Sequence, residues 1–104
     1  MTDYKVDFDE IPWTSPKPGV RFKVYSDGTC QLRLVEFFNG FAEKEWCSRG
    51  HRGYILGGDL EITFPDKTVI YRTGDTIAIP TGEEHRHKGR VLTEKVRFFV
   101  MEEL

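Results

Sequence analysis

An alternation of apolar and polar side chains constrains the fold of this chain more than any other feature. Val20, Phe22 and Val24 alternate with charged or polar neighbours, which is the period of a β-strand with one buried face. Strand-like segments, separated by turn-forming residues, return at 31–38, 42–47, 52–64, 69–71, 76–79 and 95–101. Many short strands separated by turns predict an all-β domain, either a sandwich or a barrel.

The first 19 residues have a different character. Three prolines fall within residues 11–19, and each one removes a backbone hydrogen-bond donor and fixes φ. Such a segment can run along the edge of a sheet but cannot lie in its middle. We therefore expect residues 1–19 to be an irregular lead-in packed on the domain through Ile11 and Trp13, and residues 20–104 to form the β-barrel.

Length and composition limit the function classes. With 104 residues the chain has room for one domain with one core. Its 15 basic and 17 acidic residues nearly balance and form no basic stripe, so we expect no nucleic-acid partner. No apolar run resembles a signal peptide or could span a bilayer, so we expect a cytoplasmic protein without a membrane partner. The two cysteines, Cys30 and Cys47, are too few for a disulfide framework.

One short motif is much more specific than the strand pattern. Residues 74–85 read GDTIAIPTGEEH: a glycine, five residues, a proline, any residue, a glycine, two residues and a histidine. This spacing matches the second motif of the cupin family, and residues 53–62 resemble the end of the first cupin motif. The chain therefore resembles a small single-domain cupin. The resemblance implies a cupin-type antiparallel β-barrel, or jelly roll, with one site inside the barrel.

The resemblance also implies a set of metal ligands. By the residue spacing of the two cupin motifs, His85 holds the usual ligand position of the second motif, and the three ligand positions of the first are occupied by Glu45, Cys47 and His51. None of these three matches the family residue by identity, but a carboxylate, a thiol and an imidazole all bind metals. The expected metal site is therefore Glu45, Cys47, His51 and His85. One thiolate with two imidazoles favours zinc or iron over magnesium or calcium.

Two further residues are candidates for the surroundings of this site. His87 follows His85 by two residues and would share its face of a strand. It is open whether His87 orients a ligand, replaces one, acts as a general base or is an exposed imidazole. Tyr54 is expected near the mouth of the barrel, where it would contact a bound molecule.

Two functions remain open at this point. The first is a cupin that binds a divalent transition metal inside the barrel and there binds or transforms a small organic ligand. The alternative is a metal-free ligand-binding or sensor cupin without catalytic activity, so enzymatic activity is undecided. Residues 95–101 carry apolar side chains on both faces, which predicts that one face is covered by a partner or by the N-terminal segment. We expect a homodimer.

Overall fold

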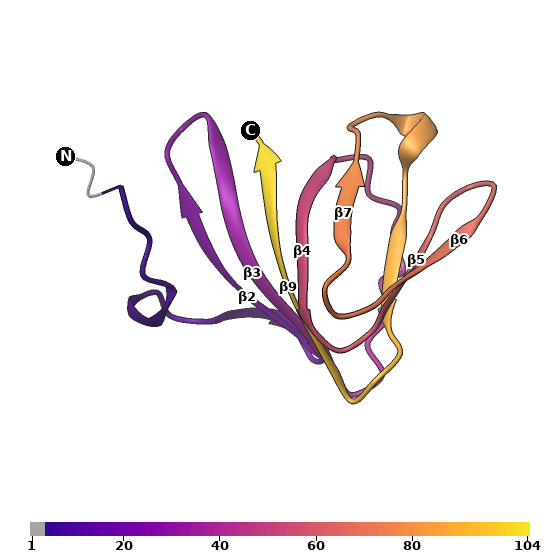
Figure 1. Ribbon diagram of the computed structural model, residues 1–104, viewed down its shortest axis with the longest axis horizontal. Coiled ribbons are helices and arrows are strands. Elements are labelled where there is room, and N and C mark those ends of the chain that lie inside the picture. Colours follow the sequence, from indigo (N-terminus) through magenta and orange to yellow (C-terminus); the bar gives the residue numbers. More distant parts are fainter. Residues whose placement is uncertain (1–3) are drawn as a thin grey trace.

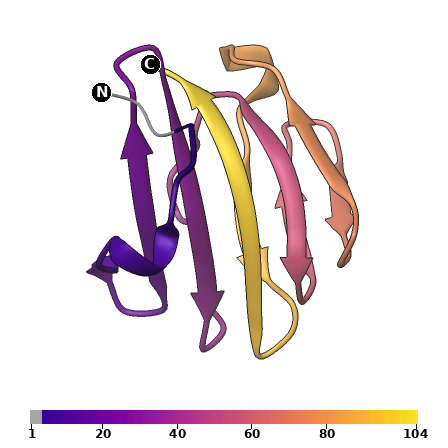
Figure 2. The same ribbon diagram turned by 60° about the vertical axis from the view of Figure 1, so that its left-hand side comes forward.

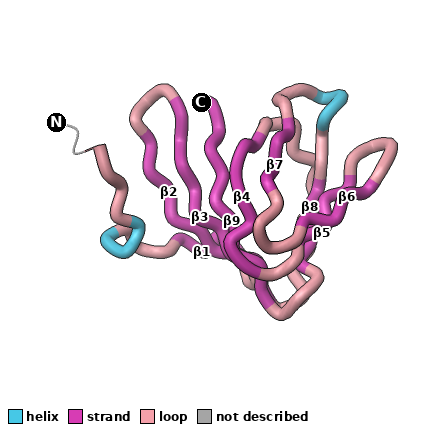
Figure 3. Tube along the Cα trace, viewed as in Figure 1, coloured by secondary structure: helices cyan, strands magenta, loops and turns pink. Residues whose placement is uncertain are grey.

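Two antiparallel β-sheets face each other in the computed structural model of the protein, which describes residues 4–104 (Figure 1). The larger sheet has the strand order β1 (Thr14–Lys17), β2 (Val20–Ser26), β3 (Cys30–Phe38), β9 (Lys95–Glu103), β4 (His51–Gly57) and β7 (Thr76–Ile79). The smaller sheet has the order β6 (Thr68–Tyr71), β5 (Leu60–Thr63) and β8 (Lys88–Val91). The helical elements of residues 4–104 are two 3-10 turns, η1 (Phe8–Glu10) and η2 (Glu83–His85), as Figure 3 shows. The all-β, antiparallel fold expected from the alternation is confirmed.

The hydrophobic core lies between the two sheets. β3 pairs with β9 along nine residues in the middle of the larger sheet, and β2 and β4 flank this pair. Successive side chains of a strand point to opposite faces, so every second residue of these strands points inward. The buried apolar residues from both sheets are Val20, Val35, Phe37, Ile55, Leu60, Ile62, Ile77, Ile79, Val91, Val96, Phe98 and Val100.

The outer face of the larger sheet carries one buried carboxylate. Glu36 points away from the core, yet it is fully buried, and Arg21 and Arg97 each lie 2.7 Å from its oxygens. Burial alone would raise the pKa of Glu36, but the two guanidinium groups overcome this effect and hold the pKa below its usual value. The charge of the Glu36 carboxylate is thus neutralised by arginine side chains on the outer face of the sheet, away from the core between the sheets.

The N-terminal segment crosses this outer face, in front of the larger sheet in Figure 2. The ring of Phe8 packs edge-on against Phe99 with 6.3 Å between the centroids, and the Lys23 ammonium donates to the Phe8 carbonyl oxygen at 2.7 Å. Part of the segment expected to be irregular forms β1, an edge strand, where Pro16 is tolerated because one side of the strand has no neighbour. Residues 1–3 of the expected lead-in lie outside the described residues.

The connection between β3 and β4 runs beside the smaller sheet. Residues 42–47, expected as a short strand, make two isolated bridges, Ala42 with Arg90 and Cys47 with His87. These bridges extend the smaller sheet past β8 and bring Cys47 next to a residue forty positions later in the chain. Within residues 4–104 no helix is long and apolar enough to span a bilayer.

Candidate metal centre

A cavity of about 220 Å³ lies between the two sheets. Its volume is below the range usual for pockets that take drug-sized molecules, so it suits a small ligand. Core side chains such as Phe22, Phe37 and Leu60 form its apolar wall. The ionisable residues of its lining are Lys17, Arg33, Glu43, Lys44, Glu45, His51 and His87.

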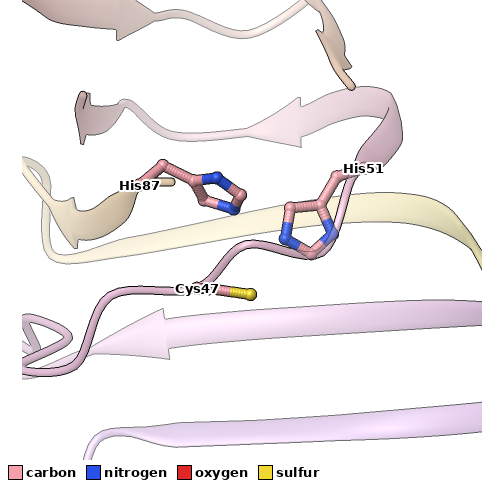
Figure 4. A group of neighbouring side chains, drawn as sticks. All are labelled: Cys47, His51 and His87. Carbon is pink, nitrogen blue, oxygen red and sulfur yellow. The ribbon is translucent and has the colours of Figure 1, made fainter. Parts of the chain in front are cut away.

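Three side chains of types that can bind a metal gather beside this cavity. One ligand atom each of Cys47, His51 and His87 lies within 4.8 Å of the other two, and Figure 4 shows the three side chains converging. His51 is the first residue of β4 in the larger sheet, whereas Cys47 and His87 belong to the bridge that extends the smaller sheet. Two backbone hydrogen bonds of 2.9 Å join Cys47 and His87, so their side chains leave the backbone as direct neighbours.

The ring of His87 is held with one nitrogen available to the cluster. His87 is 3 % exposed, and its Nδ1 lies 3.0 Å from the carbonyl oxygen of His85. A carbonyl oxygen only accepts, so Nδ1 is the donor in this hydrogen bond and Nε2 is the nitrogen left for the cluster. Nε2 is buried and has no hydrogen-bond partner among residues 4–104. This is the arrangement of a metal-ligating histidine whose other nitrogen donates to the backbone.

The ring of His51 is oriented by a carboxylate. Its Nδ1 lies 2.6 Å from Oε2 of Glu102, a residue that is 2 % exposed. Glu102 in turn accepts from Nε and Nη2 of Arg33 at 2.7 and 2.9 Å and from Nε2 of Gln31 at 2.7 Å. Burial alone would raise the pKa of Glu102, but His51, Arg33 and Gln31 lower it to about 2. The carboxylate therefore stays charged, and Nε2 of His51 is left to face the cluster.

The thiol of Cys47 is strongly acidified by the two histidines. The neighbouring imidazoles of His51 and His87 lower the pKa of Cys47 to about 5, so the thiolate predominates at neutral pH. Burial would lower the pKa of His51, but Cys47 and the Glu102 carboxylate raise it above its usual value. A thiolate is the form of cysteine that binds metals.

A fourth ionisable group, Glu43, lies in the same cavity. Its Oε1 accepts the backbone N–H of Gly89 at 2.9 Å, and its own backbone N–H donates to the Gly89 carbonyl oxygen at 2.9 Å. Burial raises the pKa of Glu43 above its usual range. The sequence motifs gave no reason to select Glu43, because it lies outside the ligand positions of the family frame.

The structure brings together only part of the ligand set expected from the sequence. Cys47 and His51 are in the cluster, but His85 is not: its side chain is 41 % exposed and its Nε2 lies 3.7 Å from Oε1 of Glu84. His85 ends the 3-10 turn η2, so the two-residue period of a strand does not apply between positions 85 and 87. His87, which pairs with Cys47, points into the cluster instead.

The other two expected residues also lie apart from the cluster. Glu45 lines the cavity but is exposed and is not among the three clustered residues. Tyr54 is 46 % exposed and, three positions after His51 on β4, falls on the opposite, outer face of the sheet. It does not line the cavity, in contrast to the expectation that it would contact a ligand there.

The donor set fits a borderline or soft divalent ion. One thiolate and two imidazoles suit zinc and iron, whereas magnesium and calcium prefer oxygen ligands. Three protein ligands leave a position free for water or a ligand, as in catalytic zinc sites. Such an ion would satisfy the buried Nε2 of His87, which has no hydrogen-bond partner in the described part of the chain.

Comparisons with known proteins identify the family. The cupin domain family matches residues 48–102, which is just over half of the 104 residues. No curated protein matches the chain in sequence. Solved structures similar to the chain include KdgF from a Halomonas species, with 20 % identity, a TM-score of 0.74, and coverage of 91 % of this chain and 89 % of that one.

Two other solved structures show how widely this fold is used. A sugar phosphate isomerase of the cupin superfamily from Silicibacter pomeroyi has a TM-score of 0.78 and 19 % identity, over 96 % of this chain and 75 % of that one. An HTH_3 family transcriptional regulator from Vibrio cholerae has a TM-score of 0.68 and 12 % identity, over 83 % of this chain and 51 % of that one. At such identities the likeness concerns the fold, and it confirms the cupin-type jelly roll. The chain belongs to the cupin domain family.

Proposed function

We propose that this cupin binds a divalent transition metal ion, zinc or iron, through Cys47, His51 and His87, and binds or transforms a small organic ligand in the adjoining cavity. The observation that carries the proposal is the orientation of the two histidines. Nδ1 of His87 is held by the His85 carbonyl oxygen, and Nδ1 of His51 lies 2.6 Å from the Glu102 carboxylate outside the cluster, which leaves both Nε2 atoms for an ion.

Each residue would have a distinct part in such a site. Cys47 supplies a negative charge that offsets half the charge of a divalent ion, and the two neutral imidazoles supply the remaining donors. A bound ion would supply Lewis acidity to an oxygen of the ligand. The cavity walls exclude water from that oxygen, and Arg33 is already engaged by Glu102, so it adds no free charge there.

Metal analysis of the purified protein tests this proposal. We expect close to one equivalent of zinc or iron in the wild-type protein and in the variant His85→Ala, and a loss of most of it in His87→Ala and Cys47→Ala. His85→Ala is the matched control, because His85 is two residues from His87 and lies outside the cluster. Less than about a tenth of an equivalent in wild type after loading with zinc would refute the metal site.

The alternative, a metal-free ligand-binding or sensor cupin, is supported by a different observation. The neighbouring imidazoles of His51 and His87 already lower the pKa of Cys47, so its thiolate is stabilised without an ion. The likeness to a transcriptional regulator is in keeping with a sensor role. This alternative predicts that zinc and a chelator leave the melting temperature unchanged, whereas the metal site predicts a rise with zinc and a fall with the chelator.

We also infer a homodimer formed through the outer face of the larger sheet. Beyond the N-terminal segment, apolar or aromatic side chains stay exposed there: Tyr25, Tyr54, Leu56 and Met101. Light scattering at micromolar concentration should give about twice the chain mass of 12.1 kDa. A single chain mass would contradict the dimer. A cytoplasmic location, which we also propose, is compatible with the two free cysteines, Cys30 and Cys47.

A further inference from the structure

Among residues 4–104, Glu43 is partly withdrawn from solvent without a cationic partner, unlike the two buried carboxylates of the larger sheet. Glu36 is paired with Arg21 and Arg97, and Glu102 with Arg33. No ion pair to Glu43 occurs among residues 4–104. A carboxylate that is partly desolvated without a counterion is costly to the fold, which calls for a functional explanation.

The backbone fixes the position of this carboxylate. Glu43 both donates to and accepts from Gly89, so two hydrogen bonds of 2.9 Å hold it against β8. A Cβ atom at position 89 would lie 3.3 Å from Oε1 of Glu43 and 3.5 Å from Cδ1 of Leu60. Glycine at this position therefore leaves the room that the carboxylate occupies.

The placement leaves one carboxylate oxygen for the cavity. Oε1 is bound to the Gly89 N–H, so Oε2 is the oxygen that a molecule in the cavity can reach. Glu43 is not among the three clustered residues, although it lines the same cavity as His51 and His87. It is therefore placed to contact a bound molecule at a second point, beside the cluster.

We propose that Glu43 is the specificity-determining hydrogen-bond acceptor of the cavity, and that the ligand carries an O–H or N–H donor next to the oxygen that binds at the Cys47, His51 and His87 cluster. The ligand class is a small hydroxy acid, hydroxyketone or hydroxamate-like molecule with a short apolar body. The apolar body contacts the wall formed by Phe37 and Leu60. This inference rests on the proposed metal site.

Two probes that differ in their hydrogen-bond donors test the proposal on the cobalt-loaded protein. Acetohydroxamate binds metals through oxygen and carries an N–H donor, whereas azide binds metals and has no donor. In Glu43→Gln the single amide oxygen is retained by the Gly89 N–H, and the NH₂ group faces the cavity. Visible absorption of cobalt reports the binding of either probe.

We expect Glu43→Gln to weaken acetohydroxamate binding about tenfold or more, because the acceptor oxygen that faces the cavity is replaced by an NH₂ donor, and to leave azide binding unchanged or tighter. The control is Glu45→Gln, which removes the exposed carboxylate of the same cavity lining and should change neither affinity more than about threefold. Equal weakening of both probes by Glu43→Gln, or no weakening of acetohydroxamate, would overturn the role of Glu43.

A failure of the metal site itself gives a different result. If the wild-type protein takes up no cobalt, the proposed function fails, and the same comparison is made by NMR on the metal-free protein. The backbone amide of Gly89 donates a hydrogen bond to Glu43. Its NMR signal should move when acetohydroxamate is added to the wild-type protein, and it should stay in place when buffer alone is added. If the Gly89 signal does not move in the wild-type protein, Glu43 does not bind the donor group.

Discussion

Replacing Glu102 by glutamine would measure how much the orientation of His51 contributes to the proposed metal binding. The pKa of Glu102 falls from an ordinary value of 4.5 to about 2, although burial alone would raise it. This difference of about 2.5 corresponds to roughly 3 kcal/mol in favour of the folded state at neutral pH. Glu102 is almost fully buried, so solvent does not screen its contacts with Arg33 and His51. Glu102→Gln keeps the size of the side chain and removes the charge that makes these contacts strong.

We expect Glu102→Gln to lower zinc affinity about 10- to 100-fold, the usual cost of losing the group that orients a ligating histidine. That is about 1.4 to 2.8 kcal/mol, which lies within the roughly 3 kcal/mol available from the Glu102 contacts. The neutral amide no longer favours the proton on Nδ1 of His51, so Nε2 is available to the ion for a smaller fraction of the time. Competition with a chromophoric chelator at neutral pH measures the affinity.

Glu36→Gln is the matched control for this experiment. Glu36 is also a buried carboxylate of the larger sheet held by arginine side chains, but it lies on the outer face, away from the cluster. Both variants should be destabilised in thermal melts, and only Glu102→Gln should lose zinc affinity. Equal losses of affinity in the two variants, or zinc binding by Glu102→Gln within about threefold of wild type, would show that the orientation of His51 is unimportant.

Three further predictions concern reactivity, packing and acid stability. Iodoacetamide should label Cys47 at similar rates at pH 6 and pH 8, because its pKa of about 5 keeps it a thiolate at both. Mass spectrometry should show that zinc protects Cys47 and does not protect Cys30. A steep rise in the labelling rate of Cys47 between pH 6 and pH 8 would contradict the lowered pKa. Gly53→Ala should cost more than about 2 kcal/mol in urea unfolding, since its Cβ would overlap a backbone oxygen of β9, whereas Gly57→Ala in the same strand has open space and should cost less than about 1 kcal/mol. The folded-state pKa of Glu102 is lowered, so the stability that its charge contributes is present above pH 4.5 and is lost as the pH falls towards 2. The difference in unfolding free energy between wild type and Glu102→Gln should shrink over this interval, and a constant difference would contradict the lowered pKa.

Much of the fold was predictable because its signals are local. The alternation that begins at Val20 and the turn residues between strands predicted every strand of the larger sheet except β1, and the spacing from Gly74 to His85 predicted the family. β8 and the bridge between Cys47 and His87 were not predictable in this way, because they depend on a pairing of segments far apart in the sequence. No local pattern records such a pairing.

Two of the three clustered residues were predicted from the spacing of the first cupin motif. Cys47 and His51 were candidates because the spacing of the first cupin motif, which ends within residues 53–62, gives them ligand positions, and the structure places both in the cluster. The spacing of the second cupin motif selected His85 as the ligand and not His87. In the structure, the turn η2 directs the His85 side chain towards solvent, and His87 takes the place in the cluster. Glu43 was missed because its position depends on the room that Gly89 leaves beside it.

The division of the cluster between two sheets has a mechanical consequence. His51 begins a strand of the larger sheet, and Cys47 and His87 extend the smaller one, so an ion bound by all three would be a cross-link between the two layers. Separating the layers would then require breaking a metal–ligand bond as well as exposing the core. The binding free energy of the ion would be added to the free energy of unfolding. Amide protons on the two sheets should therefore exchange together in the loaded protein, as parts of one cooperative unit.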